Sequence, residues 1–269
     1  MAELSNAQKN YLLRQKHHRR RVLFCRVALI LFFLALWETA AGLGWIDAFI
    51  FSSPSRIVGT AASMGQDGSI FRHTGITLLE TLASFFLTVI LGLATAILLW
   101  WSPSVSEVLE PYLVVLNSLP KSALAPLLIV WLGANMRTII TAGVSVAIFG
   151  MILNLYTGFQ QTDPEKIKLI RTLQGNRRDE LFKVVLPGTI PLFISILKVN
   201  IGLCLVGVII GEFIGSRMGL GYLIIYGSQT FQLNLVITGI VILCIIALLL
   251  YLALALAERR YLRRIRSPR

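Results

Sequence analysis

Charged residues are scarce in this chain. Asp, Glu, Lys and Arg make up only 14% of its 269 residues, whereas about 25% is usual for soluble domains. Hydrophobic residues supply 56%, and the mean hydropathy is +0.76. This composition excludes a disordered chain and an ordinary cytosolic enzyme. What remains is a polytopic membrane protein, because a helix needs about 20 apolar residues to cross the hydrocarbon layer.

Residues that carry chemistry are also few. The three cysteines, Cys25, Cys204 and Cys244, lie within or beside apolar runs and form no CxxC pair, which excludes a disulfide scaffold and a zinc site. The sequence has no GxxxxGK[ST] phosphate loop. It shows neither a metal-spaced His/Asp/Glu cluster nor a nucleophile–base arrangement. We therefore expect no catalytic residue, no metal and no cofactor site in this chain.

Long apolar runs are present instead. Three of them, at 81–101, 138–160 and 235–257, contain no Asp, Glu, Lys, Arg or His. Three further runs, at about 22–43, 110–133 and 188–214, contain charged residues, and 110–133 is also broken by prolines. The free energy that their apolar residues gain on insertion into the membrane can offset the cost of one central charge. We predict an all-α polytopic membrane protein with spans at about 22–43, 78–101, 110–133, 138–160, 188–214 and 235–257.

Positive charge gathers in three segments that flank these spans. The arm 1–21 together with Arg26, the loop 161–187 and the tail 259–269 hold 19 of the 25 Lys and Arg residues. Because cytoplasmic loops are rich in Lys and Arg, both termini and the loop are predicted to be cytoplasmic. The net charge of +12 is therefore explained by the orientation of a membrane protein, not by binding to a nucleic acid. The apolar core of the first span is longer than that of a cleaved signal peptide, so we expect this span to be retained as a membrane helix.

The cytoplasmic loop 161–187 carries the most information. Asp163-Pro164 is typical of a helix start, and Ile167, Ile170 and Leu173 then recur at helical spacing. The sequence 174–176 favours a turn, after which an apolar face resumes. Such a pair of short amphipathic helices either lies on the lipid surface or docks into a groove of a soluble partner. Composition leaves both uses open.

This loop resembles the EAA loop of ABC-type importer permeases, especially those of the nitrate/sulfonate/taurine group. In that family the pattern is approximately E-A-A-R-T-L-G, followed after about a dozen residues by a hydrophobic residue and L-P. Arg171-Thr172-Leu173 and the ending 184–187 match this pattern, whereas the glutamate and both alanines are absent. Gln174 stands where that family has glycine and Gly175 comes one position later, which predicts a turn displaced by one residue. The resemblance implies a coupling helix built from these residues: Arg171, Thr172, Leu173, Gln174, Gly175, Asn176, Arg177, Glu180, Leu186 and Pro187.

Other segments extend the resemblance over nearly the whole chain from Trp37 onward. They are Leu36-Trp37-Glu38, 51–55, Leu119-Pro120-Lys121 with 124–127, 131–133, 211–215 and 219–223. Each is a weak match alone, but together their order and spacing are similar to the family.

The resemblance implies a type I importer permease fold and a set of partners. These are two cytoplasmic ABC ATPase subunits that bind ATP and Mg²⁺, a second permease copy in a homodimer, and an external solute-binding protein. The protein is expected in a bacterial plasma membrane. The expected solute is a small anion such as nitrate, a sulfonate or taurine, or a related small organic compound. An ATP-independent channel, an ion-coupled carrier and a membrane-embedded enzyme are the alternatives.

Polar residues at membrane depth are candidates for the translocation path. They are Asn117, Ser118, Lys121, Asn154, Lys198, Glu212 and Ser216. For Lys121 and Lys198 the alternative is snorkelling or pairing within the protein, and for Glu212 it is structural pairing. Glu38 and Glu80 lie near span ends and are expected at the membrane interface.

Overall fold

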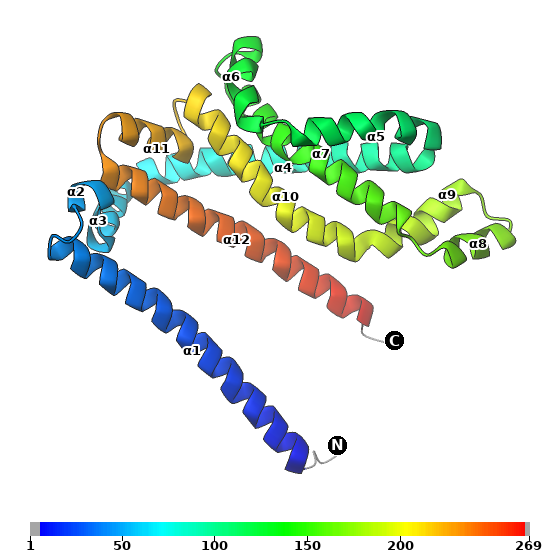
Figure 1. The fold of residues 1–269 in the computed structure, drawn as a ribbon, viewed down its shortest axis with the longest axis horizontal. Helices are drawn as coiled ribbons and strands as arrows, with labels where there is room; N and C mark the ends of the chain where they lie inside the picture. Colours follow the sequence, from blue (N-terminus) through cyan, green and yellow to red (C-terminus); the bar gives the residue numbers. More distant parts are fainter. Residues whose placement is uncertain (1–5, 267–269) are drawn as a thin grey trace.

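The computed structural model describes residues 6–266, and this part of the chain folds into helices joined by short turns (Figure 1). The elements are α1 (Asn6–Gly42), α2 (Ala48–Phe51), α3 (Pro54–Gln66), α4 (Ser69–Trp101), α5 (Pro103–Ser118), α6 (Lys121–Leu132), α7 (Met136–Gln160), α8 (Pro164–Thr172), α9 (Arg177–Glu180), the π-helical segment η1 (Leu181–Val185), α10 (Leu186–Gly215), α11 (Leu220–Gln229) and α12 (Leu233–Arg266).

Three long helices form the centre of the bundle. α7 packs along both α4 and α10, and α4 and α10 also touch each other. Phe85, Ala147, Ile201 and Cys204 are buried where these helices meet. The loop end of the bundle carries α8, α9 and η1, and the far end carries α3 and α11 (Figure 1). Most of the buried residues of the chain therefore lie on three helices that run between these two ends.

Small residues let α7 and α10 approach closely. A Cβ atom added to Gly207 of α10 would lie 2.8 Å from the carbonyl oxygen of Ala142 and 2.8 Å from Cα of Gly143, both on α7. Because apolar side chains gain little from leaving lipid, helices in membranes associate through such close backbone packing. Gly207 is thus a contact point of the central bundle.

A second cluster covers the other side of α10 near the far end. It contains the buried residues Met64, Leu205, Leu220, Leu223, Leu243 and Ile246, which come from α3, α10, α11 and α12. The short helix α11 is thereby held between α12 and α10.

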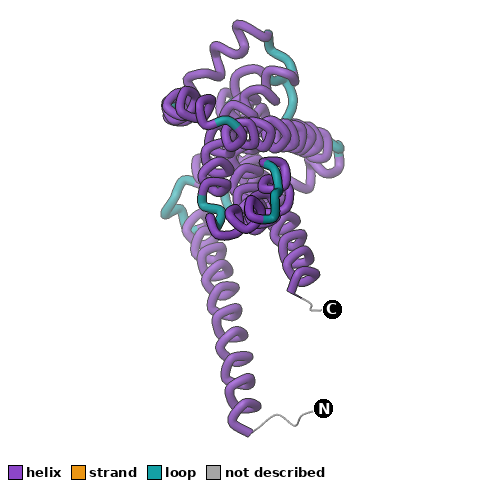
Figure 2. Tube along the Cα trace, turned by 90° about the vertical axis from the view of Figure 1, so that its right-hand side faces the viewer, coloured by secondary structure: helices purple, strands orange, loops and turns teal. Residues whose placement is uncertain are grey.

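The first helix stands apart from the bundle. α1 diverges from the other helices in both views (Figures 1 and 2), and none of its most apolar window within 20–42 is buried. It is fixed at one end, where the Glu38 carboxylate accepts hydrogen bonds from the Ser55 backbone N–H at 2.9 Å and from the Ser55 hydroxyl at 2.7 Å. Its long apolar surface is left for lipid or for another protein chain.

The third expected span, 110–133, is not one straight helix. It corresponds to α5 and α6, which meet at an angle of 96°. Of the three prolines in this region only Pro120 breaks the helix, because it has no N–H to donate and it holds Leu119 in an extended conformation. Pro111 and Pro126 remain inside α5 and α6. Together with five other helices that are long and apolar enough to cross a membrane, the bent pair makes six.

We predict that Gly207→Ala loosens the central bundle, whereas Gly202→Ala on the same helix is tolerated. No atom lies within 4 Å of a Cβ added at Gly202, but one added at Gly207 collides with the α7 backbone. Overpacking of this kind costs about 1–3 kcal/mol. The measurement is the thermal unfolding midpoint of the two purified variants in detergent, and equal midpoints would contradict the close contact.

Candidate functional site

The coupling loop begins with a well-capped helix. The Asp163 carboxylate accepts a hydrogen bond from the Glu165 N–H at 2.9 Å, and Pro164 occupies the first turn of α8. An aspartate cap with proline directly after it is a strong helix start, because the cap satisfies a free N–H and proline has none to satisfy. The helix start expected from the sequence is therefore present.

The turn that ends α8 differs from the sequence expectation. Gln174 has a φ of +60° and therefore adopts the left-handed backbone conformation. It does so at the position where the EAA loop pattern has glycine. The Gly175 N–H donates to the Ile170 carbonyl at 2.9 Å and the Gln174 N–H to the Arg171 carbonyl at 3.0 Å. These two bonds form a Schellman motif. The predicted displacement of the turn to Gly175 is wrong, because Gly175 is needed instead where its backbone passes close to Ile170.

The next helix starts with a reciprocal cap. The Asp179 N–H donates to the Asn176 side chain at 3.1 Å, and the Asn176 N–H donates to the Asp179 carboxylate at 3.0 Å. α9 then continues through η1 into α10, whose first turn holds Leu186 and Pro187. The loop is thus joined without a break to a helix of the central bundle.

An ion pair joins the two short helices. Nε of Arg171 donates to the Glu180 carboxylate at 2.6 Å, and a second contact measures 3.4 Å. The Glu180 hydrogen bond and charge raise the pKa of the Arg171 guanidinium above its ordinary value. Glu180 is buried while Arg171 is exposed. The pair fixes the angle between α8 and α9.

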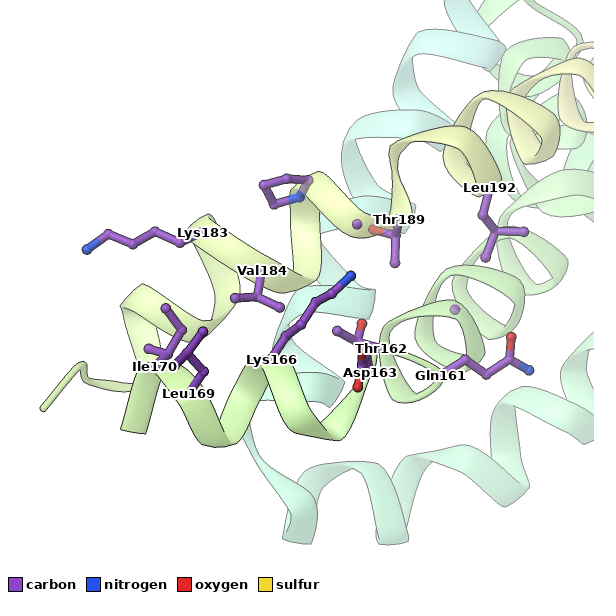
Figure 3. A pocket seen from close by; sticks show the side chains of 13 residues that line it. Gln161, Thr162, Asp163, Lys166, Leu169, Ile170, Lys183, Val184, Thr189 and Leu192 are labelled. Atoms are coloured by element: carbon purple, nitrogen blue, oxygen red, sulfur yellow. The ribbon is translucent and has the colours of Figure 1, made fainter. Parts of the chain in front are cut away.

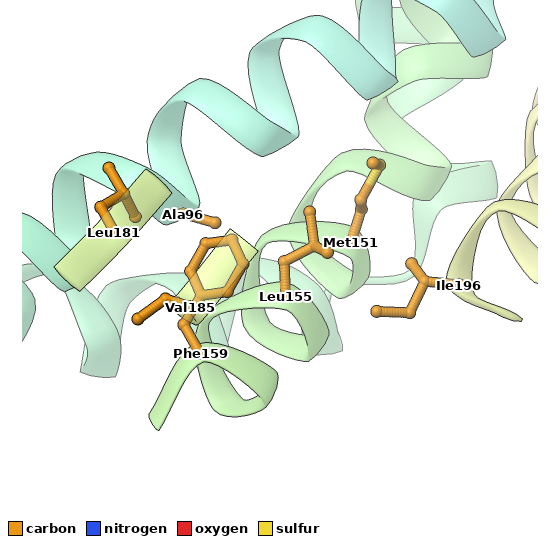
Figure 4. Close-up of a cluster of buried hydrophobic side chains, with 7 residues drawn as sticks. All are labelled: Ala96, Met151, Leu155, Phe159, Leu181, Val185 and Ile196. Carbon is orange, nitrogen blue, oxygen red and sulfur yellow. The ribbon is translucent and has the colours of Figure 1, made fainter. Parts of the chain in front are cut away.

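Packing fastens the loop to the bundle. Leu181 and Val185 of η1 are buried in a cluster with Phe159 and Leu155 of α7 and Ala96 of α4 (Figure 4).

A polar contact adds to this attachment. The Arg177 guanidinium donates to the Trp100 carbonyl at 3.3 Å and lies 5.6 Å from the centre of the Trp100 ring. A displacement of the loop must therefore move the ends of α4 and α7 with it.

Large apolar side chains remain exposed on this fixed loop. Leu173 is 70% exposed, Leu169 58% and Phe182 65%. Leu169 and Leu173 are four residues apart and so share one face of α8. Exposed apolar groups of this size on a loop rich in basic residues are suited to contact with either a protein partner or the lipid surface.

A cavity of about 630 Å³ lies behind the loop (Figure 3). α8, η1 and the ends of α7 and α10 surround it, with Lys166, Leu169, Ile170, Lys183 and Thr189 among its lining residues. The two lysines come from opposite walls, and Lys183 is paired with Asp179 at 2.6 Å.

Three of the path candidates come together at the bend between α5 and α6. The Lys121 ammonium donates to the Leu116 carbonyl and, at 3.0 Å, to the Asn117 carbonyl, and it lies 5.4 Å from the centre of the Phe149 ring. The Asn117 side chain reaches α7 beside Gly150, one turn before the exposed Asn154. We call Asn117, Lys121 and Asn154 the polar face.

Three other candidates make separate contacts. Ser118 is exposed at the end of α5, and its hydroxyl donates to the Val114 carbonyl at 3.0 Å. Lys198 is paired with Glu258 of α12 at 2.7 Å. Ser216 accepts a hydrogen bond from the Met218 N–H at 3.1 Å in the turn before α11. Of these three, Ser118 stands at the same bend as Asn117 and Lys121, whereas Lys198 and Ser216 lie away from the polar face.

Glu212 lies close to Glu80, a residue that the sequence analysis expected at the membrane interface. Glu80 of α4 is only 2% exposed, so it is buried among the helices of the bundle, and its depth in the membrane stays a prediction. It stands one turn after Thr77, whose hydroxyl donates to Glu212 at 2.6 Å, and it interacts with the Glu212 carboxyl group. A stripe of polar residues at helical spacing, Thr77, Glu80, Thr81, Ser84 and Thr88, is buried along α4. That stripe was visible in the sequence and would have indicated an inward-facing Glu80. No cluster suited to a metal ion occurs among residues 6–266.

Known proteins of similar sequence are membrane transport subunits. Residues 88–267 match the family described as "binding-protein-dependent transport system inner membrane component". A probable ABC transporter permease protein of Haemophilus influenzae is 33% identical over 229 residues, which are 85% of this chain and 93% of that protein. A putative aliphatic sulfonates transport permease protein of Bacillus subtilis is 29% identical over 230 residues, covering 86% and 83%.

Solved structures of similar fold are also importers. The MetNI methionine ABC transporter, in an inward-facing conformation, matches with a TM-score of 0.62 at 19% identity, over 69% of this chain and 92% of that chain. An amino acid ABC transporter with histidines matches with a TM-score of 0.61 at 20% identity, covering 74% and 97%. At this identity the likeness concerns the fold.

Five to six apolar spans and a loop fixed to them, together with the similar sequences, define a multi-pass transport subunit of the plasma membrane. The chain belongs to the family of binding-protein-dependent ABC importer permeases. The expected all-α type I permease fold is confirmed. Such a subunit is a transport component, not itself an enzyme, and works with an ATPase and a solute-binding protein.

We predict that Gln174→Gly stabilises the protein and that Gly175→Ala destabilises it. A left-handed conformation costs a residue with a side chain about 1–2 kcal/mol, and glycine avoids this cost. A Cβ at Gly175 would lie 2.5 Å from Cγ2 of Ile170. The melting temperatures of both purified variants check this. A stabilised Gly175→Ala variant would place the turn one residue later.

Proposed function

We propose that the exposed apolar surface of the loop is the contact through which a cytoplasmic ATPase drives this permease. The observation that carries the proposal is the combination of exposed Leu169, Leu173 and Phe182 with the burial of Leu181 and Val185 on the central bundle. The ATPase binds and hydrolyses ATP with Mg²⁺, and this chain supplies the mechanical link. Both termini and the loop are cytoplasmic in this proposal, as the distribution of Lys and Arg predicts.

The mechanism follows from rigid-body movement. ATP can shift the permease only if it binds one arrangement of the assembly more tightly than the other. The loop residues Arg171 and Glu180 keep α8 and α9 at one angle, so a movement of the ATPase pair is transmitted to α4, α7 and α10. The membrane halves then rock between outward-open and inward-open states.

The path lies on the polar face, between two copies of this chain. Asn117 and Asn154 are exposed in the single chain although they belong to helices that are expected to lie within the membrane. Exposed amides in contact with lipid would lack hydrogen-bond partners, so they are expected to face water or protein. A homodimer that places the two polar faces opposite each other meets this requirement.

The solute is a small anion, such as nitrate, a sulfonate or taurine. A cavity of about 770 Å³ at the far end is lined by Arg72, Arg217 and Asn135, and the two arginines favour a negative charge. Relatives are named for aliphatic sulfonates, taurine and nitrate, and others for formylaminopyrimidine and riboflavin. The cavity favours the first group over the second.

We predict that Leu173→Asp prevents association with the ATPase while leaving the permease folded. An aspartate in an apolar groove of the partner would be buried without a counter-charge, which is strongly unfavourable. The measurement is co-purification of the ATPase with the permease, and Leu173→Met, which keeps an apolar side chain of similar volume, is the matched control. Normal assembly and ATP-driven uptake by the Leu173→Asp variant would overturn the assignment. Solute flux in vesicles without the ATPase would instead favour a channel or a carrier.

We predict that Arg72→Gln and Arg217→Gln each slow uptake of the anionic solute, most strongly at low ionic strength. Arg137→Gln removes the same charge from an exposed residue that does not line the cavity, and it serves as the control. Initial uptake rates in vesicles that contain the complete transporter, at low and high salt, are the measurement. Equal effects of all three variants would show that the cavity does not select the charge of the solute.

A further inference from the structure

Glu212 is surrounded by hydrogen-bond donors at the far end of the bundle. Its carboxylate accepts the Thr77 hydroxyl of α4 at 2.6 Å and the Gly221 N–H of α11 at 2.5 Å. Thr77 in turn accepts the Leu220 N–H at 2.8 Å. Glu212 therefore caps the first turn of α11 and ties it to α4 and α10.

The backbone around this carboxylate is shaped to hold it. A Cβ atom at Gly219, whose φ is +105°, would lie 2.3 Å from Cδ of Glu212, and one at Gly221 would lie 2.8 Å from its Oε2. Both positions need glycine so that the chain can wrap closely around the side chain. His73 accepts the Gly219 N–H at 3.0 Å and thereby fixes the same turn.

A second carboxyl group reaches into this site. Glu80 follows Thr77 by one turn on the buried face of α4 that meets Glu212, it interacts with the Glu212 carboxyl group, and the two residues are 2% and 0% exposed. No Lys, Arg or His forms an ion pair with either of them in the described part of the chain. Two adjacent buried carboxylates that no cation pairs with repel each other strongly when both are ionised. One proton held between them removes that repulsion.

The surroundings decide which residue carries that proton. Glu212 accepts hydrogen bonds from the Thr77 hydroxyl and the Gly221 N–H at the start of a helix, an arrangement that favours the ionised form. Glu80 receives no such donors, and its Oε2 has no partner. The cavity that Glu80 lines has apolar residues such as Ile76, Leu79 and Ile139 in its wall, and its charged residues Arg72 and Arg217 form no ion pair with Glu80. We propose that Glu80 is a neutral carboxylic acid that donates its proton in a hydrogen bond to the Glu212 carboxylate, so that one bound proton holds α4, α10 and α11 together.

The proton has a route to the surface. Glu80 lines the cavity of about 770 Å³ at the far end, whose rim carries Arg72 and Arg217. Loss of the proton would leave two negative charges in contact and would release the cap of α11. The site is independent of the coupling loop, which lies at the opposite end of the bundle.

The test compares two amide substitutions that are nearly identical in shape. Glu80→Gln keeps a donor toward Glu212, so we expect a melting temperature within about 2 °C of the wild type. Glu212→Gln replaces one acceptor oxygen with an amide group that faces the donors Thr77 and Gly221, so we expect the melting temperature to fall by about 4 °C or more. Glu107→Gln, an exposed glutamate of α5, is the matched control for the loss of a carboxylate. The opposite order of the two variants would overturn the proposal.

Infrared spectroscopy of the purified, folded permease gives a second readout. A protonated buried carboxyl shows a carbonyl band that is separate from that of carboxylates and shifts in D₂O. We expect this band in the wild type and in Glu107→Gln, and its loss in Glu80→Gln. Absence of the band from the wild type, together with a melting temperature that depends on Na⁺ or K⁺, would show two ionised carboxylates around a metal cation and would overturn the proposal.

Discussion

A loop outside the membrane can move helices inside it only if loop and helices behave as one body. In this chain that condition depends on the burial of Leu181 and Val185 against Phe159, which places η1 inside the core formed by α4 and α7. The interior of such a cluster is close-packed, so small displacements are passed on and not absorbed. The short, solvent-exposed ion pair of Arg171 adds little energy by itself, because exposed pairs contribute about 0–1 kcal/mol. Its contribution is the orientation of α8.

The two ends of the bundle use carboxylates in opposite ways. At the loop end Glu180 meets a guanidinium that is open to solvent, and at the far end the buried Glu212 meets a second buried carboxyl group. Two unit charges about 4 Å apart repel by about 4 kcal/mol at an effective dielectric constant of 20. A shared proton converts that repulsion into a hydrogen bond. Protonation at the far end therefore stabilises α4 and α10, two of the three helices that the loop end moves, and ties α11 to them.

Sequence reasoning found the apolar spans and the capped start of α8 because these depend on local composition and on neighbouring residues. It failed where a distant contact decides the outcome. Of three prolines in the third span only Pro120 breaks the helix, and nothing in the sequence alone distinguishes it from Pro126. Gln174 takes a left-handed conformation because the loop must turn there to bring Arg171 to Glu180. The pairing of Glu80 with Glu212 joins residues 132 positions apart, although the polar stripe on α4 was a usable signal.

The polar residues of the spans fall into two groups. Lys198 and Glu212 find partners within the chain, and their charges are used in holding α12 and α11 to α10. Asn117 and Asn154 remain exposed beside the bend at Pro120, where the break between α5 and α6 also leaves backbone groups without helical partners. Irregular backbone at membrane depth is tolerated only where protein or water covers it. The bend and the exposed amides therefore place the same requirement on the assembly, and a single copy of the chain in lipid does not meet it.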